Sequence, residues 1–231
     1  MSVCANNLAA MNLDELERQK SQVRTLERDV ESDPFAYSSD LAWALNSLSC
    51  AQRSLGWPGD SLRSAEEAVA VLRAVCDLDE AKPKDRHDII SLLSNLSGSY
   101  GQVGRWERAV EADSEAIERQ RAIVAEHEEL LADSRRTLAG LFSGVAHGLA
   151  KSGKEDEAQR RISEARELLA LAAPVLPGRV AYELIRLHNL ERLLLFGNET
   201  AGDYHLASQC EATAGATVPH HPARASAARN L

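Results

Sequence analysis

The chain has 231 residues, of which 44% are hydrophobic, 26% charged and only 4% aromatic, and its net charge is −9. This composition is typical of a soluble globular protein rich in helix formers, and it offers little from which to build a β-sheet core. Because an acidic surface repels phosphate backbones, we expect no nucleic-acid partner.

The cysteines and the start of the chain indicate a reducing compartment. Four cysteines are widely spread and form no C-x-x-C pair: Cys4, Cys50, Cys76 and Cys210. Free thiols are therefore expected. Residues 1–18 lack the basic region and long apolar run of a signal peptide, and the longest apolar stretch, 168–176, is too short to span a bilayer. We expect a cytoplasmic protein without membrane contact.

Residues 1–35 form the first predicted segment. A thin apolar stripe with helical spacing runs through residues 12–32, which predicts a charged helix that ends before Asp33-Pro34. We interpret this helix as the second half of a degenerate leading unit.

Residues 36–173 contain three copies of one unit. The anchors Gly56, Gly104 and Gly153 lie 48 and 49 residues apart. An apolar residue stands eleven residues before each anchor, and another stands eight residues before it. A small residue stands five residues after each anchor, and another stands twelve residues after it. The matching sets are Leu45, Leu93 and Phe142; Leu48, Leu96 and Val145; Ser61, Ala109 and Ala158; and Ala68, Ala116 and Ala165. A helix, a glycine turn and a second helix are predicted in each copy.

This pattern resembles the tetratricopeptide repeat, in its long-helix variant known from kinesin light chains and from bacterial and fungal regulatory proteins. The resemblance is clearest in the second copy, in Leu93, Leu96, Ser97, Tyr100, Gly104, Trp106, Ala109 and Ala116. It implies an all-α fold, an α-solenoid of antiparallel helix pairs wound into a superhelix with flanking capping helices. The copies depart from the repeat where Gln52 and Asp113 replace aromatic residues, so we expect local irregularity there.

The C-terminal part is predicted to close the solenoid. Residues 174–212 form the capping region, in which residues 179–197 are a strong helix whose generous apolar face also suggests self-association. Residues 213–231 are small, polar and proline-containing, and we expect them to be disordered.

The three glycines Gly98, Gly101 and Gly104 have an alternative interpretation as a phosphate-binding loop. Such a loop follows a β-strand, but these glycines follow residues with helical period, and only Gly104 is repeated in the other copies. We interpret Gly104 as a turn residue and place Gly98 and Gly101 on a helix.

No catalytic, cofactor-binding or metal-binding set is predicted. The seven histidines include no H-E-x-x-H pair, and no G-x-S-x-G motif occurs. Cys50 and His147 occupy the same repeat position, but they are two units apart, so a catalytic pair is not expected. We expect that the chain is not an enzyme.

The resemblance implies a concave groove lined by the first helix of each unit. The groove residues are Trp43, Asn46, Arg53, Ser94, Asn95, Gln102, His147 and Lys151. We expect a scaffold that binds a peptide or helical protein partner there, through side-chain amides such as those of Asn46 and Asn95. The alternative is a sensor or accessory chain whose groove takes a small molecule, or even supports catalysis.

Overall fold

A computed structural model of the chain describes residues 2–78, 82–126 and 131–196, and all the regular secondary structure within these ranges is helical. The predicted all-α fold is confirmed. In chain order the helices are α1 (Ser2–Ser32), α2 (Pro34–Ser54), α3 (Pro58–Cys76), α4 (Pro83–Gln102), α5 (Trp106–Glu126), α6 (Leu131–Lys151), α7 (Glu155–Ala172) and α8 (Pro177–Phe196).

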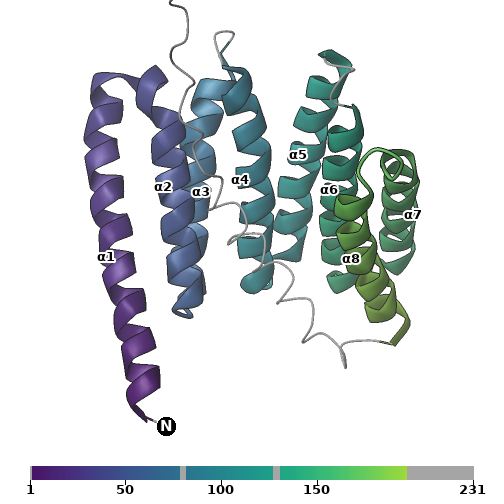
Figure 1. The fold of residues 1–231 in the computed structure, drawn as a ribbon, viewed down its shortest axis with the longest axis horizontal. Helices are drawn as coiled ribbons and strands as arrows, with labels where there is room; N and C mark the ends of the chain where they lie inside the picture. The colour runs from purple at the N-terminus through teal and green to yellow at the C-terminus, as the bar shows by residue number, and fades with distance from the viewer. Residues whose placement is uncertain (1, 79–81, 127–130, 197–231) are drawn as a thin grey trace, which may run out of the picture.

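The helices pack as successive antiparallel pairs, as in a solenoid (Figure 1). We call α2–α3, α4–α5 and α6–α7 the first, second and third units. The first helix of each unit packs on its own second helix and on the second helix of the unit before it. Helix α1 packs on α2 at one end of the row, and α8 packs on α6 and α7 at the other.

Each unit turns at its anchor glycine. Gly56, Gly104 and Gly153 have φ values of 76°, 73° and 75°, in the left-handed region that favours glycine. In all three turns the amide after the glycine donates to the carbonyl five residues earlier: Trp57 to Gln52 at 3.0 Å, Arg105 to Tyr100 at 2.9 Å, and Lys154 to Leu149 at 2.9 Å. This bond is the signature of the Schellman helix end. The predicted repeat turns are confirmed.

The repeated apolar and small residues form one continuous core. The alanines twelve residues after the glycines, Ala68, Ala116 and Ala165, are at most 1% exposed. Since an alanine adds only a methyl group, the two helices of each unit can approach closely there. The spacing of these alanines in the sequence therefore predicted where the two helices of each unit are in contact.

Proline sets the start of several helices. Pro34, Pro58, Pro83 and Pro177 are the first residues of α2, α3, α4 and α8, where the missing N–H has no helical partner to lose. At α2 the preceding Asp33 side chain also accepts a 3.1 Å hydrogen bond from the Ala36 amide. The break after residue 32 was predicted, whereas α1 begins ten residues earlier than the predicted helix.

The two ends of the row differ. Among positions 13–32 of α1, whose side chains the structure describes, the exposed residues are polar or charged apart from Leu13, and they include Glu17, Arg24 and Glu31. Helix α8 instead exposes Leu184, Ile185 and Leu195. Residues 197–231, which include the end of the predicted capping region and the segment 213–231 expected to be disordered, lie outside the described residues.

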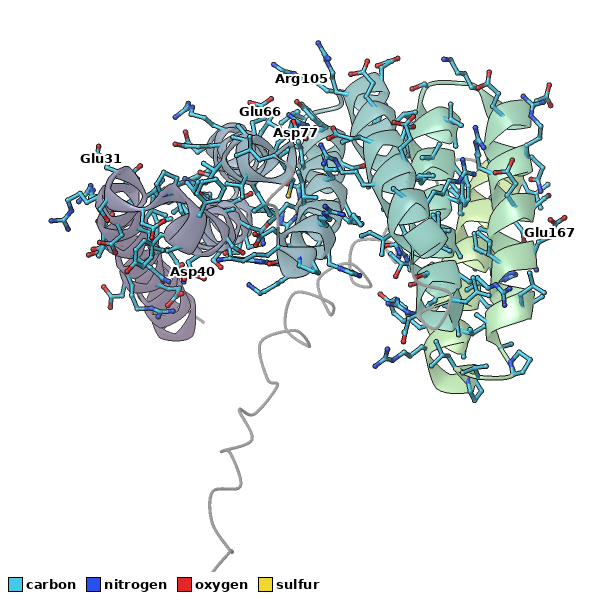
Figure 2. All side chains as sticks on the ribbon, turned by 90° about the horizontal axis from the view of Figure 1, so that it is seen from above. Glu31, Asp40, Glu66, Asp77, Arg105 and Glu167 are labelled. Atoms are coloured by element: carbon cyan, nitrogen blue, oxygen red, sulfur yellow. The ribbon has the colours of Figure 1, made fainter. Side chains whose placement is uncertain are left out.

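Ion pairs join the second helices of neighbouring units. The Arg73 guanidinium of α3 donates to both carboxylate oxygens of Glu115 in α5, at 3.2 and 2.7 Å. Arg119 then links Glu115 to Asp77, at 3.0 and 3.1 Å. In the view from above, Glu66 and Asp77 lie toward one edge of the row and Asp40 of α2 toward the opposite edge (Figure 2). The two layers of helices thus present different side chains to solvent.

The turn glycine and the helix glycine of the second unit should respond oppositely to alanine. We expect Gly104→Ala to lower the free energy of unfolding by about 1–2 kcal/mol, because a Cβ is strained at positive φ. Gly98→Ala should raise it by about 0.5–1 kcal/mol, since Gly98 lies inside α4 and an added Cβ meets nothing within 4 Å. Urea unfolding of both variants measures the difference, and an equal effect would contradict the turn assignment.

Candidate functional site

The predicted groove residues lie on α2, α4 and α6, the first helices of the three units. We define the inner face by the repeat positions that they occupy, which are residues 43, 46, 50 and 53 of α2, residues 91, 94, 95, 98 and 102 of α4, and residues 140, 143, 147 and 151 of α6. Its three units differ in what they leave open to solvent.

The second unit is the open part of the inner face. Ser91, Ser94 and Gly98 are exposed along α4 at helical spacing, and Gln102 is half-buried at the end of the helix. All three exposed residues are small. A partner could therefore approach the α4 backbone closely here, with hydroxyl groups available for hydrogen bonds.

The two predicted asparagines, one in the first unit and one in the second, bond to each other. The Asn95 Nδ2 of α4 donates to Asn46 Oδ1 of α2 at 3.1 Å, and Asn46 is only 8% exposed. A second bond joins the same helices, from Ser39 Oγ to Asp88 Oδ2 at 3.1 Å. The amides that the resemblance assigned to a peptide thus connect neighbouring units in this structure.

Two further predicted residues border this pair. Trp43 is half-buried and packs against the core. Arg53 is also half-buried, and its Nη2 donates to the Cys50 sulfur at 3.2 Å. Together they give the inner face of the first unit an aromatic and a cationic side chain.

In the third unit His147 is largely covered. The Trp106 ring meets the imidazole edge-on, with ring centroids 5.4 Å apart and planes at 65°. Burial, followed by the positive charges of Lys151 and Arg186, lowers the pKa of His147 to about 4. The imidazole is therefore neutral at neutral pH, and Lys151 stands half-buried one turn further along α6.

The two unrepeated glycines of α4 have different environments. A Cβ at Gly101 would lie 2.8 Å from the ring of Trp106, whereas a Cβ at Gly98 would meet open space. A residue without a side chain fits at position 101 because the ring of Trp106, the first residue of α5, packs against α4 there. Neither residue lies in a loop, since both belong to α4.

Charged residues of α5 and α8 lie against one side of α6, where the carboxylates are buried and the arginines are half-buried. We call Asp113, Arg136, Glu183 and Arg186 the polar cluster. Glu183 of α8 is 2% exposed and pairs with Arg136 of α6 at 3.7 Å and with Arg186 at 3.1 Å. Two glycines of α6 make room for the carboxylates. Gly140 lies against Glu183, and a Cβ at Gly144 would collide with Asp113.

Asp113 is as deeply buried as Glu183, since each is 2% exposed. Ser97 Oγ of α4 donates to its Oδ2 at 2.7 Å. Burial raises the pKa of Asp113 to about 7, although the Ser97 hydrogen bond and the charge of Arg186 oppose the shift. The irregularity expected from this residue is thus a satisfied polar contact at a core position. Gln52 is the same kind of case, because it accepts from Ser64 Oγ at 2.8 Å.

The arrangement offers little reactive chemistry in the part of the chain that the structure describes. Helix α4 lies between α2 and α6 and so separates Cys50 from His147. Burial raises the pKa of the Cys76 thiol to about 11, which keeps it protonated. No group of three His, Cys, Asp or Glu side chains with metal-binding geometry occurs among the described residues.

The surface and the helices limit other kinds of site. A hollow of about 460 Å³ runs along α7, and its lining comes from one helix: Asp156, Gln159, Arg160, Ser163 and Glu164. Such a lining is the solvated side of a helix rather than a converging pocket. Across the described helices, none combines the length and the apolar character that a membrane span requires.

Sequence reasoning missed the polar cluster and the Asn46–Asn95 contact. One signal was present for the cluster, because Gly140, Gly144 and Gly148 recur every four residues on α6, which indicates a close approach along one helix side. The identity of the approaching side chains, one from α5 and one from α8, required the three-dimensional arrangement.

Comparison with known proteins supports the fold. No known protein-family profile matches the chain, and no curated protein matches it. Among solved structures it is similar to the crystal structure of BtubC (BKLC) from P. vanneervenii, with a TM-score of 0.55 and 16% sequence identity. The match covers 95% of this chain and 98% of that chain. At this identity the similarity shows the fold alone, that of a helical repeat protein.

The buried carboxyl group predicts an unusual pH dependence of stability. Since the pKa of Asp113 rises from its usual 3.8 to about 7 on folding, the folded chain binds more protons than the unfolded chain between these values. The contribution of Asp113 to the free energy of unfolding therefore falls as pH rises through this window, by on the order of 1 kcal/mol per pH unit. In urea unfolding from pH 4.5 to 8, the free energy of unfolding of Asp113→Asn should increase relative to that of the wild type as pH rises. If the two free energies change in parallel with pH, the raised pKa of Asp113 is disproved.

Proposed function

We propose that the chain is a tetratricopeptide-type repeat protein that binds a protein segment on its inner face. The proposal rests on the repeat residues and on where they lie. Leu93, Leu96 and Ala116 are core residues, Gly104 is the left-handed turn residue, and the same pattern recurs in the other two units. Such arrays present their first helices as an extended binding surface.

The observation that carries the proposal is the open stretch of α4. Ser91, Ser94 and Gly98 are exposed on the inner face, while the corresponding stretches of α2 and α6 are more covered. A peptide or helix laid on this stretch can approach the α4 backbone, and serine hydroxyls both donate and accept hydrogen bonds. Trp43, which is half-buried on the inner face of α2, adds apolar contact area. These side chains suit recognition rather than reaction.

A bulky residue in the middle of the open stretch should block the partner. We expect Gly98→Trp to reduce the recovery of specific partners from the native cell by at least tenfold, because the indole would fill the space that the glycine leaves open. The partner is identified by mass spectrometry after capture on the immobilised wild-type chain, and its affinity for each variant is then measured by calorimetry.

The matched control is Gly59→Trp on α3, another helical glycine whose added Cβ meets nothing within 4 Å. It carries the same side chain on the other layer and should leave binding unchanged. Equal affinity of the wild type and Gly98→Trp would refute the inner-face assignment, whereas circular dichroism shows whether the helices are retained.

A second candidate function is pairing of two copies through α8. The exposed apolar residues Leu184 and Leu195 are eleven positions apart, about three helical turns, so they lie on one side of the helix, and exposed Ile185 adjoins Leu184. Helix α8 presents this apolar side at one end of the row, whereas the exposed residues among positions 13–32 of α1, at the other end, are polar or charged apart from Leu13. One self-complementary end favours a closed two-fold pair rather than an open filament.

Sedimentation velocity tests the pairing. We expect the wild type to sediment as a dimer at micromolar concentration and Leu184→Glu with Ile185→Glu as a monomer, because facing carboxylates repel and lose apolar contact. A monomeric wild type at 100-fold higher concentration would exclude this second candidate and leave the inner-face proposal untouched.

A further inference from the structure

Helix α8 is placed differently from the other first helices. Within the preceding unit, helices α4 and α6 pack mainly on the second helix and touch the first helix only lightly. Helix α8 contacts α6 as extensively as it contacts α7 (Figure 1). It is therefore shifted toward the inner face of the third unit.

Equivalent repeat positions show what this shift covers. Ten residues before the turn glycine stand Asn46, Ser94 and Ser143. Asn46 meets the next first helix through its bond to Asn95, so this position faces the following unit. Ser94 is exposed, whereas Ser143 is 0% exposed and lies about one turn from Gly140, against which Glu183 and Arg186 of α8 are placed. At this position the third unit is covered and the second is open.

The contact that closes it is partly polar. Of the residues that α8 buries, Val180, Leu187 and Leu190 are apolar, but Glu183 is a carboxylate seated against Gly140 and between two arginines. Removing charges from water costs about as much as their pairing returns, so a buried ion pair adds little net stability. The same helix side built from leucines would hold more tightly.

Nothing among the described residues packs on the opposite side of α8. Leu184, Ile185 and Leu195 are 40%, 60% and 75% exposed. Opening α8 breaks only its contacts with α6 and α7, because a terminal helix of a repeat array has neighbours on one side. Residues 173–176 connect α7 to α8, and half of them, Pro174 and Val175, are exposed. Such an element opens at a lower free energy than the core.

We propose that α8 is a releasable lid on the inner face of the third unit. When closed, it covers Ser143 and the side of α6 that carries Gly140 and His147. When open, it extends the exposed inner face from the second unit onto the third, while α1 to α7 stay folded. The lid goes beyond the proposed partner binding, and its opening is measured without any partner.

Thiol labelling of single cysteine variants tests the lid. Ser143→Cys reports on the covered position, Ser94→Cys on the equivalent open position, and Ser49→Cys on the 3% exposed interface between α2 and α3. Modification by N-ethylmaleimide is followed by peptide mass spectrometry, which separates the new thiol from the four native cysteines. We expect Ser143→Cys to react at least tenfold more slowly than Ser94→Cys and at least tenfold faster than Ser49→Cys.

A charge-removing substitution on α8 then identifies the contact that holds the lid. We expect Glu183→Gln to accelerate labelling of Ser143→Cys at least tenfold, because it removes the buried carboxylate that two half-buried arginines share, and to leave Ser49→Cys unchanged. The matched control is Glu191→Gln on the same helix, whose partner Arg166 is largely exposed. It should change the rate less than twofold.

Three results would overturn the lid. Labelling of Ser143→Cys as slow as that of Ser49→Cys, with or without Glu183→Gln, means that α8 opens only when the whole chain unfolds. Labelling as fast as that of Ser94→Cys means that α8 does not cover the third unit. Equal acceleration of all buried thiols by Glu183→Gln means that the polar cluster stabilises the whole array. Hydrogen exchange of the α8 amides in the unsubstituted chain gives an independent readout, and it should be faster than that of α6 and α7.

Discussion

One backbone constraint sets the course of the chain: the residue that ends the first helix of each unit must adopt a positive φ. Gly56, Gly104 and Gly153 meet it, and the Schellman bonds around them satisfy carbonyls that the helix would otherwise leave unpaired. The turn sends the second helix back along the first. Only in that antiparallel arrangement do the repeated alanines face the partner helix and let the two backbones approach. The layers, the core and the inner face all depend on it.

Polar residues inside this core are tolerated where a neighbouring helix supplies a partner. Gln52 bonds to Ser64 within the first unit, and Asp113 bonds to Ser97 within the second. Glu183 finds its partners between the third unit and α8. An unpaired buried polar group costs about 1–3 kcal/mol, so each such contact fixes the register of the helices that make it. Gly140 and Gly144 serve this purpose as well. They act through the absence of a side chain rather than through φ.

The repeat was readable from the sequence because it depends on local spacing. Turn glycines, apolar stripes and the break at Asp33 are each set within about one helix length, and the structure places all of them as expected. The Asn46–Asn95 bond was not readable, since its two residues lie 49 positions apart and meet only through the register of adjacent units. Gly101 was unexplained for a similar reason, because the ring that approaches it comes from across the turn. What each inner-face residue touches is a property of the packing.

The two ends of the array show how such packing can connect stability to function. In a repeat array each unit is held by its own interior and by its neighbours, so the last helix has the fewest contacts to lose. Here that helix buries a carboxylate, which makes its attachment specific for Arg136 and Gly140 without making it strong. The same helix determines how much of the inner face is exposed. A change in the strength of one buried ion pair would therefore alter the length of the surface that the chain can offer, while the glycine turns keep the units themselves intact.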